Sequence, residues 1–175
     1  MTESKSLWIR WKSEVRTEVR VRQLFPAGHA MALLIENMGR VNYGAGLVDR
    51  KGLLTKAPVD GNWTATCLPL LPGQVGALRF SHMPPGANPG PVFRRGNLFV
   101  NGTPADTFLD SRGFTKGYVW VNGKSLGRYW ETAGPQHTLF LPAPFLSQGN
   151  NTVILLDLHA ATTAAIESVA MPRFG

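Results

Sequence analysis

The chain has 175 residues, enough for one β-sandwich or two small ones but not for an eightfold β/α barrel, which needs roughly 200 to 250 residues. Its 19 glycines and 13 prolines favour short strands joined by turns, because both residues weaken helix interiors. The net charge of +7 favours an anionic partner, and the single cysteine, Cys67, excludes an intrachain disulfide and favours a reducing compartment.

The first part of the chain has two possible local structures. An apolar residue recurs at helical spacing from Trp8 to Val19, whereas residues 17–22 alternate apolar and polar as a strand does. We favour a strand near the end of this segment. Residues 30–36, with the sequence AMALLIE, form a short apolar run that ends in a turn, and this pattern predicts a buried strand.

Two weaker strands follow, and then a break. Leu53 to Val59 and Trp63 to Leu68 read as strands interrupted by proline and by an Asp-Gly pair. Residues 81–91, with the sequence SHMPPGANPGP, are too rich in proline and glycine for regular structure. We interpret them as a connector between two parts of the chain.

Beyond the connector, short strands follow one another at the spacing typical of a sandwich or barrel. An Asn-Gly pair at Asn122 and Gly123 follows an alternating run and predicts a hairpin with a primed turn. The predicted strands are Asn97 to Val100, Asp106 to Asp110, Gly117 to Asn122, Thr138 to Leu141, Thr152 to His159 and Thr163 to Ala170.

One sequence motif resembles a catalytic one. Residues 123–127, GKSLG, fit the G-x-S-x-G elbow of serine hydrolases, with Asp157 and His159 downstream in the hydrolase order. An elbow needs a helix after the serine, and here a Gly-Pro turn follows Trp130 instead. We therefore interpret the match as accidental.

The histidines and glycines predict neither a metal site nor a cofactor. The four histidines have no spacing or acidic neighbours typical of metal ligands. They are His29, His82, His137 and His159. No Gly-Lys-Ser/Thr phosphate loop occurs, so nucleotide binding has no support.

Several stretches nevertheless resemble a known family. Residues 34–44 (LIENMGRVNYG) with 49–53 resemble the first accessory β-domain of the beta-galactosidases of glycoside hydrolase family thirty-five. Residues 106–110, 113–123 and 126–130 resemble the second accessory β-domain of the same enzymes, and the tail from Gly134 to Leu158 continues that pattern in order.

The resemblance implies an all-β fold built from galactose-binding-like jelly-roll β-sandwiches, one complete and one partial. Residues 1–29 do not clearly match the strands that begin the family's first β-domain. The implied organisation is a divergent N-terminal segment over 1–29, a partial first β-domain over 30–80, the connector over 81–91 and a jelly-roll galactose-binding-like domain over 92–175.

The resemblance implies no catalytic residue. In the family the two catalytic glutamates stand on a barrel that precedes these domains. None of the six glutamates of this chain matches a catalytic motif, so we predict that it is not an enzyme. An incomplete first sandwich would leave apolar surface uncovered, which predicts a protein partner or a second copy of the chain.

Three functions remain open. The first is a non-catalytic structural or protein-interaction subunit of a larger assembly, in an intracellular compartment such as the mitochondrion, since no secretory signal or transmembrane run is evident. The second is a carbohydrate-binding module, and the third is the accessory piece of a split beta-galactosidase. A fourth function, nucleic-acid binding, rests only on the net charge and on a few arginine pairs such as Arg94 with Arg95. The residues best suited to stack on or hydrogen-bond a sugar are Trp130, Tyr129, Arg128 and Trp63.

Overall fold

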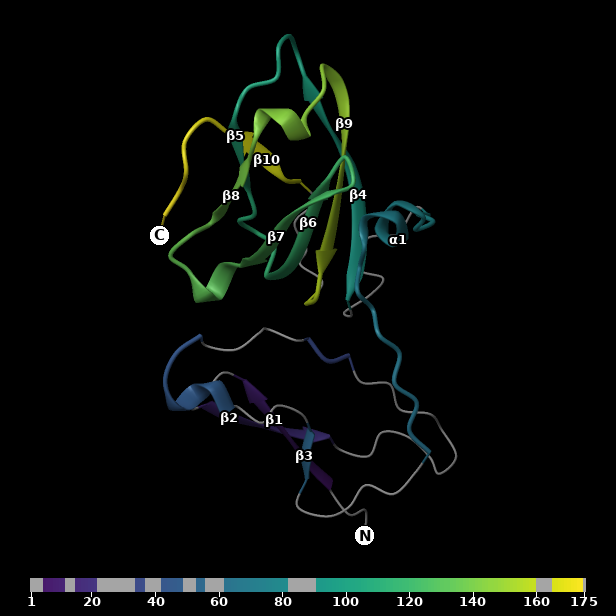
Figure 1. Ribbon diagram of the computed structural model, residues 1–175, viewed down its shortest axis with the longest axis vertical. Coiled ribbons are helices and arrows are strands. Elements are labelled where there is room, and N and C mark those ends of the chain that lie inside the picture. Colours follow the sequence, from purple (N-terminus) through teal and green to yellow (C-terminus); the bar gives the residue numbers. More distant parts are fainter. Residues whose placement is uncertain are drawn as a thin grey trace. The chain divides into compact units, whose positions relative to one another are not determined.

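The chain forms two compact units, residues Met1–Thr66 and Cys67–Gly175, each described by itself (Figure 1). Nearly all of the regular structure is antiparallel β-sheet, which confirms the all-β prediction. None of the helices in the described segments is long and apolar enough to cross a membrane. The computed structural model describes residues 5–11, 15–21, 34–36, 42–48, 53–55, 62–81, 91–159 and 165–174.

The first unit contains a three-stranded antiparallel sheet in the order β2-β1-β3. Strands β1 (Lys5–Trp11) and β2 (Val15–Val21) pair along their whole length, and β3 (Leu53–Thr55) pairs with the other edge of β1. A short 3-10 helix, Ala45–Val48, lies between β2 and β3 in sequence. The strand predicted near the end of the N-terminal segment is confirmed as β2, and the helical alternative is wrong. Strand β1 lies before Ser13, where the sequence pattern favoured neither structure.

Two other predictions for this unit are wrong where the structure describes them. Residues 34–36 of the AMALLIE run have no regular structure, and the side chains of Leu34 and Ile35 are 58% and 67% exposed. Residues 62–68 also form no strand. An apolar run shows that a segment would gain from burial, but burial also requires a second surface to cover it.

The second unit is a sandwich of two antiparallel sheets. The larger sheet has the order β4-β9-β6-β7 and the smaller one the order β10-β5-β8. The strands of the larger sheet are β4 (Val92–Val100), β9 (Gly149–Asp157), β6 (Lys116–Val121) and β7 (Lys124–Trp130). Those of the smaller sheet are β10 (Glu167–Val169), β5 (Thr107–Asp110) and β8 (Thr138–Leu141).

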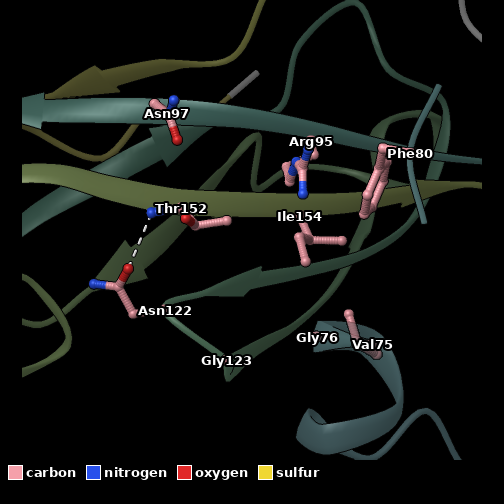
Figure 2. Close-up of a pocket in the computed structure, with 9 residues that line it drawn as sticks. All are labelled: Val75, Gly76, Phe80, Arg95, Asn97, Asn122, Gly123, Thr152 and Ile154. Atoms are coloured by element: carbon pink, nitrogen blue, oxygen red, sulfur yellow. Dashed lines mark hydrogen bonds between the residues drawn. The ribbon is translucent and has the colours of Figure 1, made fainter. Parts of the chain in front are cut away.

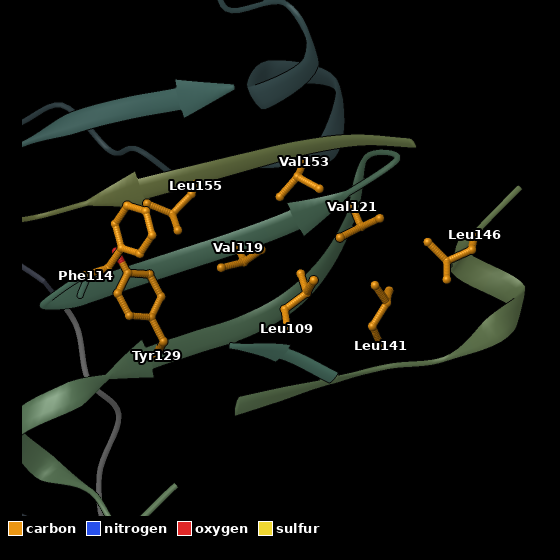
Figure 3. Close-up of a cluster of buried hydrophobic side chains, with 9 residues drawn as sticks. All are labelled: Leu109, Phe114, Val119, Val121, Tyr129, Leu141, Leu146, Val153 and Leu155. Atoms are coloured by element: carbon orange, nitrogen blue, oxygen red, sulfur yellow. The ribbon is translucent and has the colours of Figure 1, made fainter. Parts of the chain in front are cut away.

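A hydrophobic core fills the space between the two sheets (Figure 3). Leu109 of β5 and Leu141 of β8 meet Val119 and Val121 of β6 there, and all four side chains are fully buried. Alternate residues of β4, β6, β8 and β9 pack into this core, as expected for sheets packed face to face. Two single-turn 3-10 helices, Glu131–Ala133 and Ala143–Phe145, flank β8.

The opposite face of the larger sheet carries a second, smaller core. A short helix, α1 (Pro72–Gly76), places Val75 at 1% exposure against Trp120 of β6 and Ile154 and Leu156 of β9. Trp120 is 3% exposed and is therefore a core aromatic of this second cluster. The sequence predicts that residues 30–80 form the partial first β-domain, whereas in the structure residues 67–80 belong to the second unit.

Candidate functional site

The turn between β6 and β7 is the local feature that sequence predicted best. Asn122 has a φ of 49° and Gly123 a φ of 76°, so both central residues lie in the left-handed region that a primed turn requires. Strand β7 pairs with β6 from Lys124 to Trp130, which confirms the hairpin.

Asn122 also anchors this turn to the end of β9. Its side-chain amide donates to the side-chain oxygen of Asn151 at 2.7 Å and to the carbonyl oxygen of Phe145 at 2.9 Å. Its own side-chain oxygen accepts from the backbone N–H of Thr152 at 3.0 Å. These bonds occupy the Asn122 side chain in holding the turn, so its role is structural.

Beside this turn, the outer face of the larger sheet has a hollow of about 480 Å³ (Figure 2). Arg95 and Asn97 of β4 and Thr152 of β9 supply exposed polar side chains. Ile154 and Val75 supply buried apolar ones. The remaining lining residues are Gly76, Phe80, Asn122 and Gly123. Sequence analysis missed this site, because it did not place residues 75–80 on the sheet.

Tyr129 cannot serve as an exposed sugar platform, which corrects its prediction. Its side chain is 3% exposed, packs edge-on against Phe114 and donates a hydrogen bond to the carbonyl oxygen of Leu156 at 3.1 Å. Burial, together with the nearby carboxylate of Asp157, raises the pKa of the Tyr129 hydroxyl above its ordinary value. Tyr129 is therefore a neutral core residue of the sandwich.

Trp130 and Arg128 both lie on β7. The side chain of Trp130 already contacts neighbouring residues. The ammonium of Lys116 lies 4.1 Å from the centre of the Trp130 ring, and the indole N–H donates to the hydroxyl of Thr132 at 3.0 Å. Arg128 is exposed to solvent. Trp63 is 54% exposed and belongs to the first unit. The four predicted sugar residues therefore do not form one site within the second unit.

The role of Tyr129 predicts a pH-dependent effect of Tyr129→Phe. At neutral pH we expect the variant to lose about 1 kcal/mol of the free energy of unfolding, the worth of one hydrogen bond. Above pH 10 the gap to wild type should shrink, because an unfolded tyrosine ionises near pH 10 whereas the folded Tyr129 stays protonated, and this destabilises only the wild type. Urea unfolding between pH 7 and 11 measures the gap.

Tyr43→Phe provides the control for this experiment, because Tyr43 is 88% exposed. Its gap to wild type should not change with pH. A Tyr129→Phe gap that is equally constant from pH 7 to 11 would contradict the assignment of Tyr129 as a buried neutral hydroxyl.

Ser125 lies on a strand and not on a nucleophile elbow. It is part of β7 directly after the hairpin turn, and its hydroxyl accepts from the N–H of Gly127 at 3.2 Å. Asp157 is fully buried and accepts from the hydroxyl of Thr115 at 3.0 Å and from the backbone N–H of His159. The strand–turn–helix context of a serine hydrolase does not occur here.

Asp110 at the end of β5 pairs with two arginines, and sequence analysis did not predict these contacts. Arg112 and Arg173 both pair with Asp110, at 2.8 and 2.6 Å, and Arg173 thereby joins the end of the chain to β5. Burial acts to raise the pKa of the Asp110 carboxyl, but its hydrogen bonds with the two arginines outweigh burial and lower the pKa. His137 pairs with Glu131 at 2.9 Å.

The described segments contain no group of three or more His, Cys, Asp or Glu side chains that could hold a metal ion. His137 has a carboxylate partner, and His159 lies at the end of β9. His29 and His82 fall outside the residues that the structure describes.

Comparison with known proteins identifies both halves of the chain. Residues 10–68 match the first all-beta domain of beta-galactosidase, and residues 91–151 match the beta-galactosidase galactose-binding domain. Beta-galactosidase-1-like protein 2 of Homo sapiens is 38% identical over 154 residues, which cover 83% of this chain and 24% of that protein. Beta-galactosidase of Macaca fascicularis is 36% identical over 178 residues, which cover 85% of this chain and 26% of the enzyme.

These matches agree with the two units and with their strands. The galactose-binding match covers β4 to β8 and the start of β9, and the first all-beta match covers the end of β1 and all of β2 and β3. The chain spans about a quarter of the length of the curated relatives it matches. It belongs to the beta-galactosidase family, in the part that forms the first all-beta domain and the galactose-binding domain.

Proposed function

We propose that the chain acts as a non-catalytic structural and protein-interaction subunit, derived from the accessory β-domains of a beta-galactosidase. The observation that carries this proposal is apolar surface on the first unit. The side chains of Leu34, Ile35 and Leu47 are 58%, 67% and 49% exposed, and that of Tyr43 is 88% exposed. Large apolar side chains exposed on one unit are typical of a surface that contacts another protein.

The nature of the two matched regions also supports this proposal. Both belong to accessory β-domains, and the residues predicted to bind sugar serve other purposes in part: Tyr129 in the core and Trp130 against Lys116. A sandwich that keeps its fold while its aromatic residues serve packing is well suited to hold or position another protein. The +7 charge favours an assembly with acidic components, and we extend the proposal to an organellar compartment such as the mitochondrion.

Native mass spectrometry of the chain purified gently from its source cells tests this function. We expect a complex of fixed stoichiometry with a second kind of polypeptide. The double variant Leu34→Asp with Ile35→Asp should lose at least about 90% of that complex, because two charges would have to be desolvated in an apolar contact.

Met171→Asp is the matched control, since Met171 is 72% exposed but lies in the second unit. It should retain the complex. A monodisperse wild-type monomer would contradict the proposal. A homo-oligomer would make the second copy the partner and overturn the subunit role. A barrel-bearing glycosidase in fixed ratio would establish instead the accessory piece of a split beta-galactosidase.

A further inference from the structure

We propose that the hollow on the outer face of the larger sheet binds an acidic monosaccharide, with Arg95 pairing the sugar carboxylate. This inference is independent of the subunit role, because it concerns only the second unit. The hollow has a volume of about 480 Å³, within the range of roughly 300 to 1,000 Å³ typical of small-molecule sites.

Arg95 supplies the positive charge of the site. Its guanidinium lies over the ring of Phe80, 4.7 Å from the ring centre (Figure 2). Stacking of this kind fixes the plane of the guanidinium and leaves its N–H groups free at the edges. Within the described part of the chain, Arg95 has no carboxylate partner. A fixed arginine with free donors is suited to bidentate pairing with a carboxylate.

The polar groups that would form hydrogen bonds with the hydroxyls of a sugar lie next to Arg95. Asn97 is two residues further along β4, so it projects from the same face at roughly 7 Å. Thr152 lies directly opposite Asn97 in the register of β4 and β9, which brings their Cβ atoms to about 5 Å. Both side chains are exposed and line the hollow (Figure 2). Together the three residues present donors and acceptors over the width of one pyranose ring.

The floor of the hollow is apolar. Ile154 is the cross-strand neighbour of Arg95 and is 6% exposed, and Val75 of α1 is 1% exposed. A pyranose has one apolar C–H face and a rim of hydroxyls, so a site with an apolar floor and polar edges matches its chemistry. A simple inorganic anion would use Arg95 alone and leave the remaining surface without a role.

Titration of the isotope-labelled full chain with galacturonate, followed by NMR, tests the proposal. Galactose is the matched neutral ligand because it differs only at C6, and acetate is the matched carboxylate without a ring. We expect galacturonate to shift the backbone resonances of residues 95–97 and 152–154 and to bind about tenfold more tightly than either control ligand. Arg95→Ala should weaken galacturonate binding about tenfold or more, and Thr152→Val about threefold or more.

Arg79→Ala is the control variant, because it removes one exposed arginine of the second unit that does not line the hollow. It should bind galacturonate as wild type does. Arg128→Ala tests the alternative that the sugar binds at β7. Loss of binding in Arg128→Ala but not in Arg95→Ala would move the site to β7 and overturn the proposal. Equal affinities for galacturonate and acetate, equal affinities for galacturonate and galactose, or no binding to the folded chain would each overturn it as well.

Discussion

Gly117→Ala is expected to lower the free energy of unfolding of the second unit by at least about 3 kcal/mol, or to prevent its folding. Gly117 lies on β6 between Tyr129 of β7 and Asp157 of β9. A Cβ at this position would overlap the backbone carbonyl of Leu156 and lie 2.9 Å from the hydroxyl of Tyr129. Backbone atoms in the middle of a sheet cannot move aside without breaking the ladder of hydrogen bonds on both sides.

Gly96→Ala is the matched control for this prediction. Gly96 also lies in a strand of the larger sheet, but no atom comes within 4 Å of the position a Cβ would take. We expect a change within about 1 kcal/mol, because alanine gains strand propensity without a clash. Hydrogen exchange of β9 peptides during urea unfolding measures the free energy of unfolding of the second unit in both variants. Equal stability of the two variants would contradict the close packing of β6 at Gly117.

Asn151→Asp is the second substitution with a large expected effect. The buried side chain of Asn151 accepts at 2.7 Å from the N–H of Ser147 and from the side-chain amide of Asn122. Its own amide donates to the carbonyl oxygens of Leu98, Ser147 and Gly149. An aspartate would direct an oxygen at three carbonyl oxygens, and we expect a loss of at least about 3 kcal/mol at pH 7.

The loss at Asn151→Asp should depend on pH with a defined sign. Burial, together with the three carbonyl oxygens that face one oxygen of the introduced carboxyl, raises its pKa above the unfolded value of about 3.9, because only the protonated form can donate to a carbonyl oxygen. The destabilisation should therefore be smallest near pH 4 and grow as pH rises. Asn150→Asp, at the exposed neighbouring position, should change stability by less than about 1 kcal/mol at every pH. A pH-independent loss at Asn151→Asp would refute the hydrogen-bond account.

Sequence patterns were sufficient where local chemistry alone decides the structure. The Asn122-Gly123 pair requires left-handed backbone, and both residues adopt it. Strand β8 has the bounds predicted from the turn signals around it, Thr138–Leu141. The all-β class followed from composition and turn spacing, and the family followed from motifs that lie mostly on these same strands and turns.

The burial of Tyr129 could not be predicted, because the pairing of β6 with β7 contains an irregularity that no sequence pattern indicates. The register shifts between Val119 and Trp120, whose partners are Gly127 and Ser125, so Leu126 is an extra residue on β7. Leu126 and Tyr129 are three residues apart, yet both pack on the core between the sheets. A bulge reverses the alternation of faces, so a period-two pattern alone does not predict which side of the sheet Tyr129 faces.

The hollow could not be predicted for a different reason. It depends on α1, a five-residue helix that local propensity does not reveal, because an isolated helix this short has no stability of its own. Val75 forms part of the hollow because it packs on Trp120 and Ile154, residues far along the chain. Arg95 could be noted in sequence only as one member of a basic pair, since its position over Phe80 exists only once the segment has packed on the sheet.

Hydrolysis of an aryl β-galactoside by the native assembly that carries this chain tests the central claim most directly. The chain should be purified from its source cells with its partners in place, and activity should be measured alongside the native mass. The account predicts a complex heavier than the 19.1 kDa chain with no galactosidase activity above that of a mock purification. Galactosidase activity that co-purifies at fixed stoichiometry with the chain would contradict it.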